Sequence, residues 1–291
     1  MSALRRVATI IGYEWRRALA KKKIVTLVIL VFAVQIIIFV IFHYLFTSPP
    51  TNLPSPLQEQ LELALEQTRP LMWIVEVLAP QGLFMSLVAI MIVGGSMSEE
   101  YEHGTADILL SKPITKIEYL IGKYLGGLSL LSFVTALTTI LGIILAVAFF
   151  SPQENLQLIP HIFLAVVYSN LVFLSLAFMF SEVLRKTTLA YLCAIGVFIG
   201  SMITSGVLSS VYAFTGESIY LDASKWLPNW SVSNFPSFVM GELLDAPSIM
   251  FASLVHGDLL LAGALIAVYT TIFVVAATVR LVRSDVTKKA D

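Results

Sequence analysis

Six long apolar runs constrain this chain more than any other feature of its sequence. They occupy residues 24–46, 81–98, 119–150, 161–181, 188–212 and 259–279. A helix of about 20 apolar residues is long enough to cross the hydrocarbon core of a bilayer. Hydrophobic residues make up 57% of the 291 residues and charged residues only 13%, a composition that excludes an ordinary soluble domain. We therefore expect an all-α polytopic membrane protein with six transmembrane helices.

The segment before the first run, residues 1–23, predicts a helix that lies on the membrane. Apolar side chains recur on one face at helical spacing: Leu4, Ile11, Trp15 and Leu19. Basic residues, including Arg16 and Arg17, lie outside that stripe. An apolar stripe with an interfacial tryptophan and a basic opposite face suits a helix in the headgroup plane. The regularity of the stripe disfavours the alternative, a nucleic-acid-binding arm.

Two segments between the runs are expected on the outer side of the membrane. The first, residues 47–80, begins with prolines and ends with Leu71–Ala79, which is apolar apart from Glu76. We expect this stretch to rest on the outer membrane surface. The second, residues 213–258, mixes aromatic residues, prolines and a few acids, and its tryptophans suit a membrane interface.

The distribution of basic residues predicts the orientation. Segments 1–23, 98–123, 182–187 and 280–291 hold 16 of the 18 Lys and Arg residues, and only Arg69 and Lys225 lie on the other side. Basic residues concentrate in cytoplasmic segments of membrane proteins. The sequence therefore predicts cytoplasmic termini in a multi-pass protein of the cell membrane.

The fifth run carries small residues spaced about four apart: Gly196, Gly200, Ser201 and Ser205. Such spacing permits close contact between membrane helices. Two interpretations stay open, namely packing within one subunit and a seam with a second subunit or a wall of a transport path.

The polar loop at residues 99–118 contains local signals for where helices end and begin. Gly104 can end the incoming helix because glycine adopts positive φ at low cost. Thr105 can cap a short helix through Leu110, with Asp107 in its first turn, where a negative charge suits the helix dipole. Pro113 then interrupts that short helix.

The third run begins with its own start signal. Thr115 followed by Glu118 has the spacing of a capping box, in which each residue satisfies a backbone N–H group of the other. The loop therefore predicts a helix end, a short transverse helix, a turn and a new helix start.

Three acids at the end of the second run need basic partners: Glu99, Glu100 and Glu102. They lie near a helix C-terminus, where the helix dipole disfavours negative charge. One interpretation pairs them with arginines of the same chain or leaves them at a solvated rim. The other makes them a docking surface for a second protein.

The residues of this loop resemble a known family. Glu-Glu-Tyr-Glu-His-Gly-Thr at 99–105, Asp-Ile-Leu-Leu-Ser-Lys-Pro-Ile at 107–114 and Tyr-Leu-Ile-Gly-Lys at 119–123 are similar to the segment after the second span in transmembrane subunits of ABC-2 type transporters. The resemblance implies that the loop is a coupling helix, contacting a separate ATP-binding subunit. The apolar anchors would then be Ile108, Leu109 and Leu110. The resemblance also implies that residues 213–258 form short, half-embedded helices on the outer side.

Several kinds of chemistry are missing from the sequence. It has no Walker-type phosphate loop, no zinc-protease or hydrolase motif, and no cluster with metal-ligand spacing. We therefore predict no catalytic residues, no metal site and no cofactor bound by this chain. By the resemblance, ATP and Mg belong to the partner subunit.

The cores of the six runs also lack Asp, Glu, Lys and Arg, whereas ion-coupled carriers usually keep acids at membrane depth. This disfavours an ion-coupled carrier.

The resemblance predicts a membrane subunit of an ATP-driven transporter, an exporter that works as a homo- or heterodimer with two ATP-binding subunits. The alternative is a membrane scaffold or assembly factor that recruits a cytosolic partner without transport. No residue pattern selects the transported substrate.

Overall fold

The computed structural model describes residues 2–47, 54–79, 84–105, 114–150, 152–244 and 259–283, and this part of the chain is helical, without strands. Within it, five helical segments are long and apolar enough to cross a membrane. They are α2 (Lys23–Thr47), α8 (Lys116–Phe149), the pair α9 (Ile159–Ser169) and α10 (Leu171–Leu184), α11 (Thr187–Thr215) and α14 (Leu259–Arg283). The all-α polytopic membrane fold predicted from the sequence is confirmed.

The apolar run at 81–98 does not form one of these five long helices. It contains α5 (Ser86–Val93), and α6 (Ser98–Glu102) follows after a turn that begins at Gly94 and Gly95. Consecutive glycines disfavour a continuous helix, because each costs about 1 kcal/mol relative to alanine. The described residues therefore hold five long apolar helices, and a sixth span within residues 81–98 stays a prediction.

Between α5 and α6, side chains from other helices form hydrogen bonds with the backbone groups that the break in the helix leaves unpaired. The Ser181 hydroxyl accepts hydrogen bonds from the backbone N–H groups of Met97 and Ser98, at 3.1 and 3.0 Å. Arg17 donates to the carbonyl oxygens of Gly95 and Ser96, at 3.3 and 3.0 Å. A broken helix is tolerated in a membrane when its freed backbone groups find such partners.

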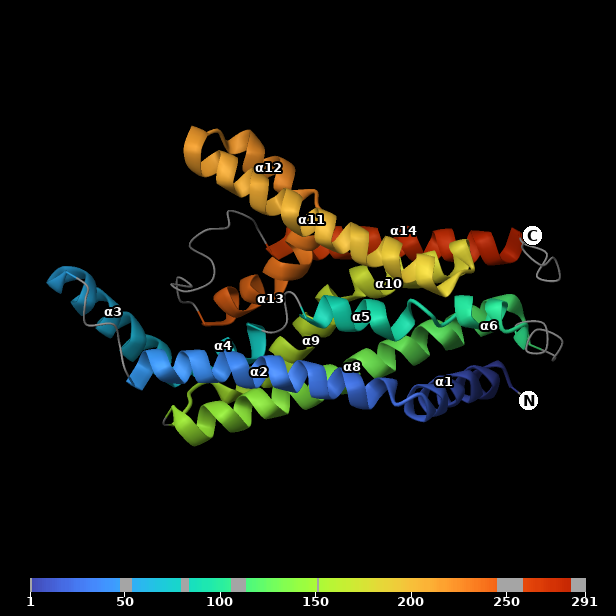
Figure 1. Ribbon diagram of the computed structural model, residues 1–291, viewed down its shortest axis with the longest axis horizontal. Coiled ribbons are helices and arrows are strands. Elements are labelled where there is room, and N and C mark those ends of the chain that lie inside the picture. Colours follow the sequence, from blue (N-terminus) through green and yellow to red (C-terminus); the bar gives the residue numbers. More distant parts are fainter. Residues whose placement is uncertain are drawn as a thin grey trace.

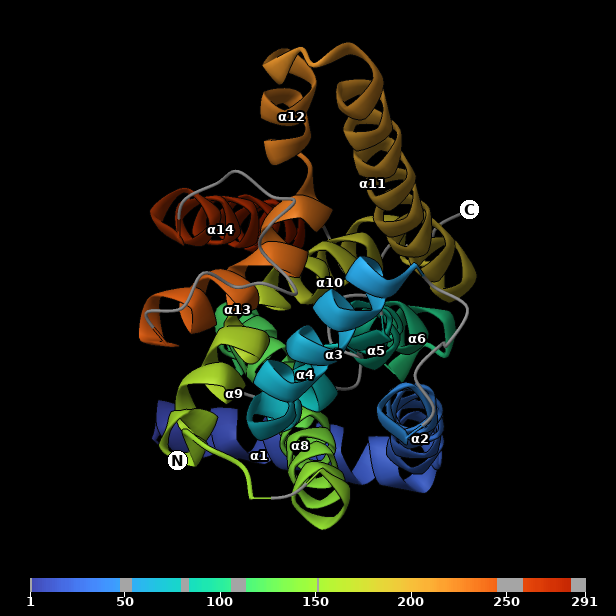
Figure 2. The same cartoon turned by 90° about the vertical axis from the view of Figure 1, so that its left-hand side faces the viewer.

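The helices run roughly along one axis, with α10 and α5 in the middle of the bundle (Figures 1 and 2). Helix α10 packs against α14, α11 and α5, while α1 (Ala3–Ala20) packs against α8. The start of α1, the end of α14 and α6 lie at the same end of the molecule, which we call the terminal end (Figure 1). Shorter helices lie toward the opposite end: α3 (Ser55–Thr68), η1 (Arg69–Leu71), α4 (Met72–Leu78), η3 (Leu156–Leu158), α12 (Ser218–Lys225) and α13 (Pro228–Leu244).

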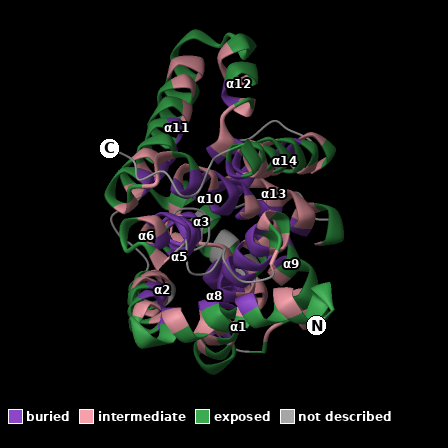
Figure 3. Cartoon of the chain, turned by 90° about the vertical axis from the view of Figure 1, so that its right-hand side faces the viewer, coloured by how far each residue is buried: buried purple, intermediate pink, exposed green. Residues whose placement is uncertain are grey.

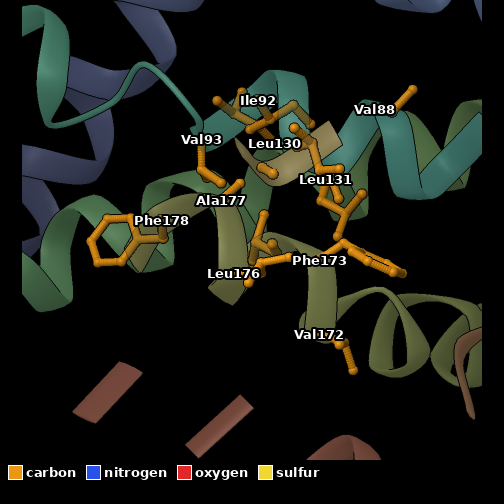
Figure 4. Close-up of a cluster of buried hydrophobic side chains, with 14 of the residues drawn as sticks. Val88, Ile92, Val93, Leu130, Leu131, Val172, Phe173, Leu176, Ala177 and Phe178 are labelled. Carbon is orange, nitrogen blue, oxygen red and sulfur yellow. The ribbon is translucent and has the colours of Figure 1, made fainter. Parts of the chain in front are cut away.

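The main core fills the space between α5, α8 and α10. Figure 4 shows side chains of these three helices pointing toward one another, among them Ile92, Leu131 and Phe173. Buried residues concentrate in the middle of the bundle, and exposed residues cover its periphery (Figure 3). Many of the exposed residues are large and apolar, such as Ile37 in α2 and Ile203 in α11. This distribution suits helices whose outer faces contact lipid rather than water.

The expectation that Leu71–Ala79 rests on a membrane surface is wrong. Residues 72–77 are all buried, and α4 packs inside a second apolar cluster with Phe39, Phe150 and Ile162. The physical reason is that α4 has no polar face: Glu76 is its one charged residue, so every side of the helix is driven to bury apolar surface. The structure therefore carries an acid among the spans, outside the six apolar runs.

The small residues of α11 divide between two faces. Ser201 is buried and Ser205 half-buried, whereas Gly196 and Gly200 are exposed. A Cβ atom added at either glycine would meet no described atom within 4 Å. These two glycines therefore do not serve close packing within the described part of this chain. A seam with a second subunit stays a prediction.

Candidate functional site

Helix α1 lies unusually close to α8 because two glycines of α8 face it. A Cβ atom at Gly122 would come within 2.7 Å of Ile10, and one at Gly126 within 2.9 Å of Glu14. Trp15 adds a hydrogen bond of 2.8 Å from its indole Nε1 to the hydroxyl of Ser129. Small residues four apart let two helix backbones approach each other. The sequence pattern thus places the acid Glu14 directly against the start of a membrane span.

Six charged side chains meet at this contact and form what we call the charge cluster: Glu14, Arg17, Lys21, Glu99, Glu100 and Lys123. They come from α1, its end, α6 and α8. Lys123 is at the centre and is 0% exposed. Its Nζ donates to Glu14 Oε1 at 2.6 Å, to the carbonyl of Ser96 at 3.1 Å and to Glu100 Oε1. A buried ammonium group with three acceptors is satisfied, whereas an unpaired one would be very costly.

Glu100 is the second buried member, with a side chain that is 2% exposed. Its Oε1 binds Lys123 and lies 3.4 Å from Arg17 Nη1, while its Oε2 accepts a hydrogen bond from the Tyr119 hydroxyl. The acid therefore connects α6 with both α1 and α8. Charge-assisted hydrogen bonds of this kind are about twice as strong as neutral ones.

The outer part of the charge cluster is built around Glu99. Its Oε2 accepts hydrogen bonds from both Arg17 and Lys21. Burial alone would raise the pKa of Glu99, but the hydrogen bonds and positive charges of Lys21 and Arg17 outweigh burial and lower it. For Arg17, burial favours a lower pKa, yet the three surrounding glutamates raise it. Both groups therefore stay ionised, and three acids balance three bases.

The other acid of the sequence, Glu102, connects α6 with α11. It accepts hydrogen bonds from the backbone N–H and the hydroxyl of Thr187, at 3.0 and 2.6 Å. These hydrogen bonds, side chain first and backbone second, lower the pKa of Glu102. Thr187 is the first residue of α11, so Glu102 caps that helix from another helix.

Tyr101 completes the attachment of α6. Its hydroxyl donates to Glu182 Oε2 of α10 at 2.7 Å, and the guanidinium of Arg185 lies 4.5 Å from the centre of its ring. Four consecutive residues, 99–102, thus reach α1, α8, α10 and α11 between them. The short helix before the polar loop is fixed to most of the bundle at its terminal end.

For Glu99 and Glu100, these contacts favour the interpretation that the acids pair within the same chain. Glu99 and Glu100 pair with basic residues of the same chain, and Glu102 pairs with Thr187. Glu99 and Glu100 therefore have basic partners within the chain that offset their charges. The docking role of the loop itself stays a prediction, since Asp107, Ile108, Leu109 and Leu110 lie outside the described residues.

The local signals that flank the loop are confirmed. Gly104 has a φ of 67° directly after α6, as expected for a helix that ends in the left-handed region. Thr115 and Glu118 form both hydrogen bonds of a capping box at the start of α8. Glu118 also binds Arg6 of α1, at 3.1 Å to Nε and 2.5 Å to Nη2. Thr105 follows Gly104 within the described residues, and its hydroxyl lies 3.4 Å from the carbonyl of Glu100.

The residues predicted for the interfacial helix differ in their exposure in the structure. Leu4 is 83% exposed and Leu19 is also exposed, which leaves both free to meet lipid. Ile11 and Trp15 are half-buried, and Arg16 is exposed. Arg17, expected on the basic face, points instead into the charge cluster. The reason is that Glu14, one turn earlier, turns the polar side of the helix toward α8.

Sequence reasoning missed Glu14, Tyr119 and Lys123. A signal for two of them was present: Glu14 is the one acid in an otherwise basic helix, and Lys123 stands at the edge of an apolar run. A charge in such a place needs a partner nearby, but the sequence does not say which one.

The site is built for attachment rather than for bond chemistry. In the described part of the chain, no group of three or more His, Cys, Asp and Glu could hold a metal ion. The charge cluster pairs its own acids and bases completely. Its chemical content is a set of strong contacts that join the helix before the loop to the membrane spans.

Comparison with known proteins assigns the chain to a family. The family model described as ABC-2 family transporter protein matches residues 8–286. The chain belongs to the ABC-2 family. A search of curated proteins finds no match. Membership in the ABC-2 family makes the chain the membrane component of a transporter, a multi-pass subunit that associates with ABC ATP-binding subunits and with the lipid bilayer.

The family match covers the whole site, from α1 through the charge cluster to α14. ABC-2 membrane components are transport subunits and are typically not themselves catalytic. The charge cluster therefore belongs to a transport subunit.

Proposed function

We propose that this ABC-2 subunit forms the membrane path of an ATP-driven exporter of the cell membrane. It works as a dimer, with two ATP-binding subunits that bind ATP and Mg on the cytoplasmic side. The termini and the loop after α6 face those subunits. Closure of the ATP-binding subunits pushes on residues 105–112 and shifts the spans.

The observation that carries this proposal is the fixed attachment of α6. Force applied to the loop after Gly104 reaches α6 first. From there, Glu100 and Lys123 pass it to α8, Arg17 passes it to α1, and Glu102 passes it to α11. A loop that merely connected two spans would not need three attachments within four residues. Packed interfaces switch between discrete arrangements rather than deforming continuously, so such a lever can move whole helices.

The position of the termini supports the predicted orientation. The start of α1, the end of α14 and α6 lie at the terminal end, and the basic residues of α1 and α14 lie there too (Figure 1). Cysteines in place of Ser55 and Ser218 should react with an impermeant thiol reagent in intact cells, whereas one in place of Ser111 should not. Cys193, which is partly exposed, is first replaced by serine to remove background labelling. The reverse labelling pattern would overturn the orientation.

The decisive experiment alters the loop and leaves the charge cluster intact. Leu109 and Leu110 are both changed to serine, because short interfaces concentrate their energy in a few apolar anchors, each worth ~1–4 kcal/mol. The altered subunit should still insert, since no span is touched. Capture of the ATP-binding subunit and transport-linked ATP hydrolysis in liposomes should both fall.

A matched control makes the same two changes at the opposite end of the bundle (Figure 1). Leu57 and Leu63 of α3 are exposed, so serine at both positions removes similar apolar area far from the loop. This control should hydrolyse ATP like the parent. If the loop variant also binds and turns over like the parent, the loop is only a connector. A subunit that recruits the ATP-binding partner but moves nothing would instead favour a scaffold.

A further inference from the structure

Glu76 has an ionisable side chain, and no described residue is paired with its carboxyl group. Its side chain is 0% exposed, and both carboxyl oxygens lack a hydrogen-bond partner among the described residues. It lies in the middle of α4, a helix of seven residues. Native proteins rarely leave a buried polar group unpaired, and each such case calls for an explanation.

Two sets of contacts fix the depth of α4 in the bundle. At its start, the Trp73 backbone N–H donates to Gln153 Oε1 at 3.0 Å, and the Trp73 indole donates to the carbonyl of Glu154 at 2.8 Å. Both partners lie just beyond the end of α8. Farther along, Gln35 Nε2 donates to the carbonyl of Glu76 at 3.2 Å and to that of Thr138 at 3.0 Å.

Gln35 is the middle residue of the 25-residue span α2. A helix of seven residues is about 10 Å long. Helix α4 therefore begins at the end of the bundle opposite the terminal end and descends to mid-span, so Glu76 lies at membrane depth. Helix α4 packs against α8 and α2, and Figure 2 shows it above α8 and beside α9.

The surroundings of Glu76 are apolar. The cluster around α4 includes Phe39, Phe150, Ile162 and Met240, from α2, the end of α8, α9 and α13. An ionised carboxylate in such a setting, with neither donors nor a counter-ion, is far less stable than a neutral carboxyl group. A metal cation would need a shell of oxygen ligands, which these side chains do not supply.

Ionisable side chains occur on each element around α4. They are Lys23, His43 and Tyr44 in α2, Arg69 in η1, Glu154 before η3, His161 and Tyr168 in α9 and Glu242 in α13. Lys23 is the first residue of α2, and its ammonium group donates to the Tyr191 hydroxyl. The ionisable side chains of α8 lie within its first nine residues, at the terminal end. His43 is occupied in ring contacts with Phe39 and Phe149. Among the described residues, no side chain donates a hydrogen bond to the Glu76 carboxyl group.

We propose that Glu76 is a proton-binding site. Its carboxyl group is buried without a partner at mid-span and holds a proton there at neutral pH. The stability of this packing is thereby linked to pH. The residue lies outside the six apolar runs, which is why charge-free runs did not exclude a titrating group inside this membrane protein.

The first test detects the proton directly. Infrared spectra of the full chain in lipid nanodiscs at neutral pH should show the carbonyl-stretch band of a protonated carboxyl group. Glu76→Gln should remove one such band. Glu154→Gln serves as the matched control, because that side chain is exposed and lies next to the start of α4, and its spectrum should keep the band. An unchanged spectrum in Glu76→Gln would show that the carboxyl is ionised and would overturn the proposal.

The second test measures stability against pH. As pH rises above the ordinary range of a glutamate, the unfolded chain loses the proton and the folded chain keeps it, so the parent should become less stable. Glu76→Gln and Glu76→Leu cannot titrate and should lack this decline. The slope of the free energy of unfolding against pH should differ between the parent and either variant by the amount that one bound proton gives. The Glu154→Gln control should follow the parent.

Two outcomes of the second test would contradict the proposal. One is a melting temperature of the parent that rises with sodium chloride relative to choline chloride at constant pH, which would assign the site to a metal cation. The other is that both neutral variants fail to fold while the parent lacks the infrared band, which would show that an ionised Glu76 is required.

Discussion

The charge cluster predicts a large cost for removing Lys123 alone. In Lys123→Met the stem of the side chain is replaced by one of similar size, while the ammonium group is lost. Glu14 and Glu100, which now share that group, would remain buried with only Arg17 nearby. The change therefore leaves uncompensated charge in the interior, and it does so without creating a large cavity.

The expected loss of stability follows from the burial of the ion pairs that Lys123 forms. Breaking a buried ion pair by removing one partner costs about 3–5 kcal/mol. Because Lys123 is fully buried and has two carboxylate partners, we expect a value in that range. With roughly 2–4 °C per kcal/mol for a chain of ~150–250 residues, the melting temperature should fall by roughly 6–20 °C.

The assay compares melting of the purified subunit in nanodiscs across four proteins. Lys21→Met is the matched control: it removes the same group from a half-exposed pair with Glu99, which is worth ~0.2–1 kcal/mol, so melting should change by roughly 4 °C at most. The fourth protein carries Lys123→Met together with Glu14→Gln and Glu100→Gln. It removes all three charges and should recover most of the loss, since whole buried ion pairs can be replaced at little cost.

Two results would refute this reasoning. If Lys123→Met melts like Lys21→Met, the ammonium group is not buried between two carboxylates. If the triple variant melts as low as Lys123→Met alone, the loss comes from packing rather than from unpaired charge.

Three further outcomes are expected. Gly126→Leu should force α1 away from α8 and cost about 1–3 kcal/mol in thermal unfolding, whereas Gly196→Leu, with open space around it, should leave the single subunit unchanged. Ion pairs lower the pKa of Glu99, so its contribution to the free energy of unfolding is present above the ordinary pKa of a glutamate and is lost as pH falls through the lowered value. Glu99→Gln should therefore flatten the loss of stability at acid pH. An unchanged loss would contradict the pairing. Ile11→Asp with Trp15→Asp should reduce co-purification with the ATP-binding subunit without blocking insertion, since each apolar side chain stabilises by roughly 1.5–3 kcal/mol when fully buried; unchanged assembly would show that the stripe is incidental.

Much of the fold could be predicted because the relevant signals are local. Hydropathy located the long helices, since a span must be apolar along its whole length. The end of α6 followed from Gly104 and the start of α8 from Thr115 with Glu118, because caps depend on residues three or four apart. These signals need no knowledge of which helices are neighbours.

The rest depends on neighbours that the sequence does not reveal. Glu14 and Lys123 are 109 positions apart, so their pairing required the packing of α1 on α8 to be known. Glycine spacing was equally ambiguous: Gly122 and Gly126 make a close approach, while Gly196 and Gly200 face open space. Hydropathy also placed α4 at a surface, because a short apolar helix gives the same signal whether it lies on a membrane or inside a bundle.

The long separation within the charge cluster has a consequence for biosynthesis. Ribosomes make Glu14 and Arg17 first, then Glu99 and Glu100, and Lys123 last. Until the segment that becomes α8 has been made, Glu14 and Glu100 lack their central cation, and burying them is costly. The buried contact of α1 with α8 can therefore form only after the third apolar run has been synthesised, so the third span completes the packing of the first helix.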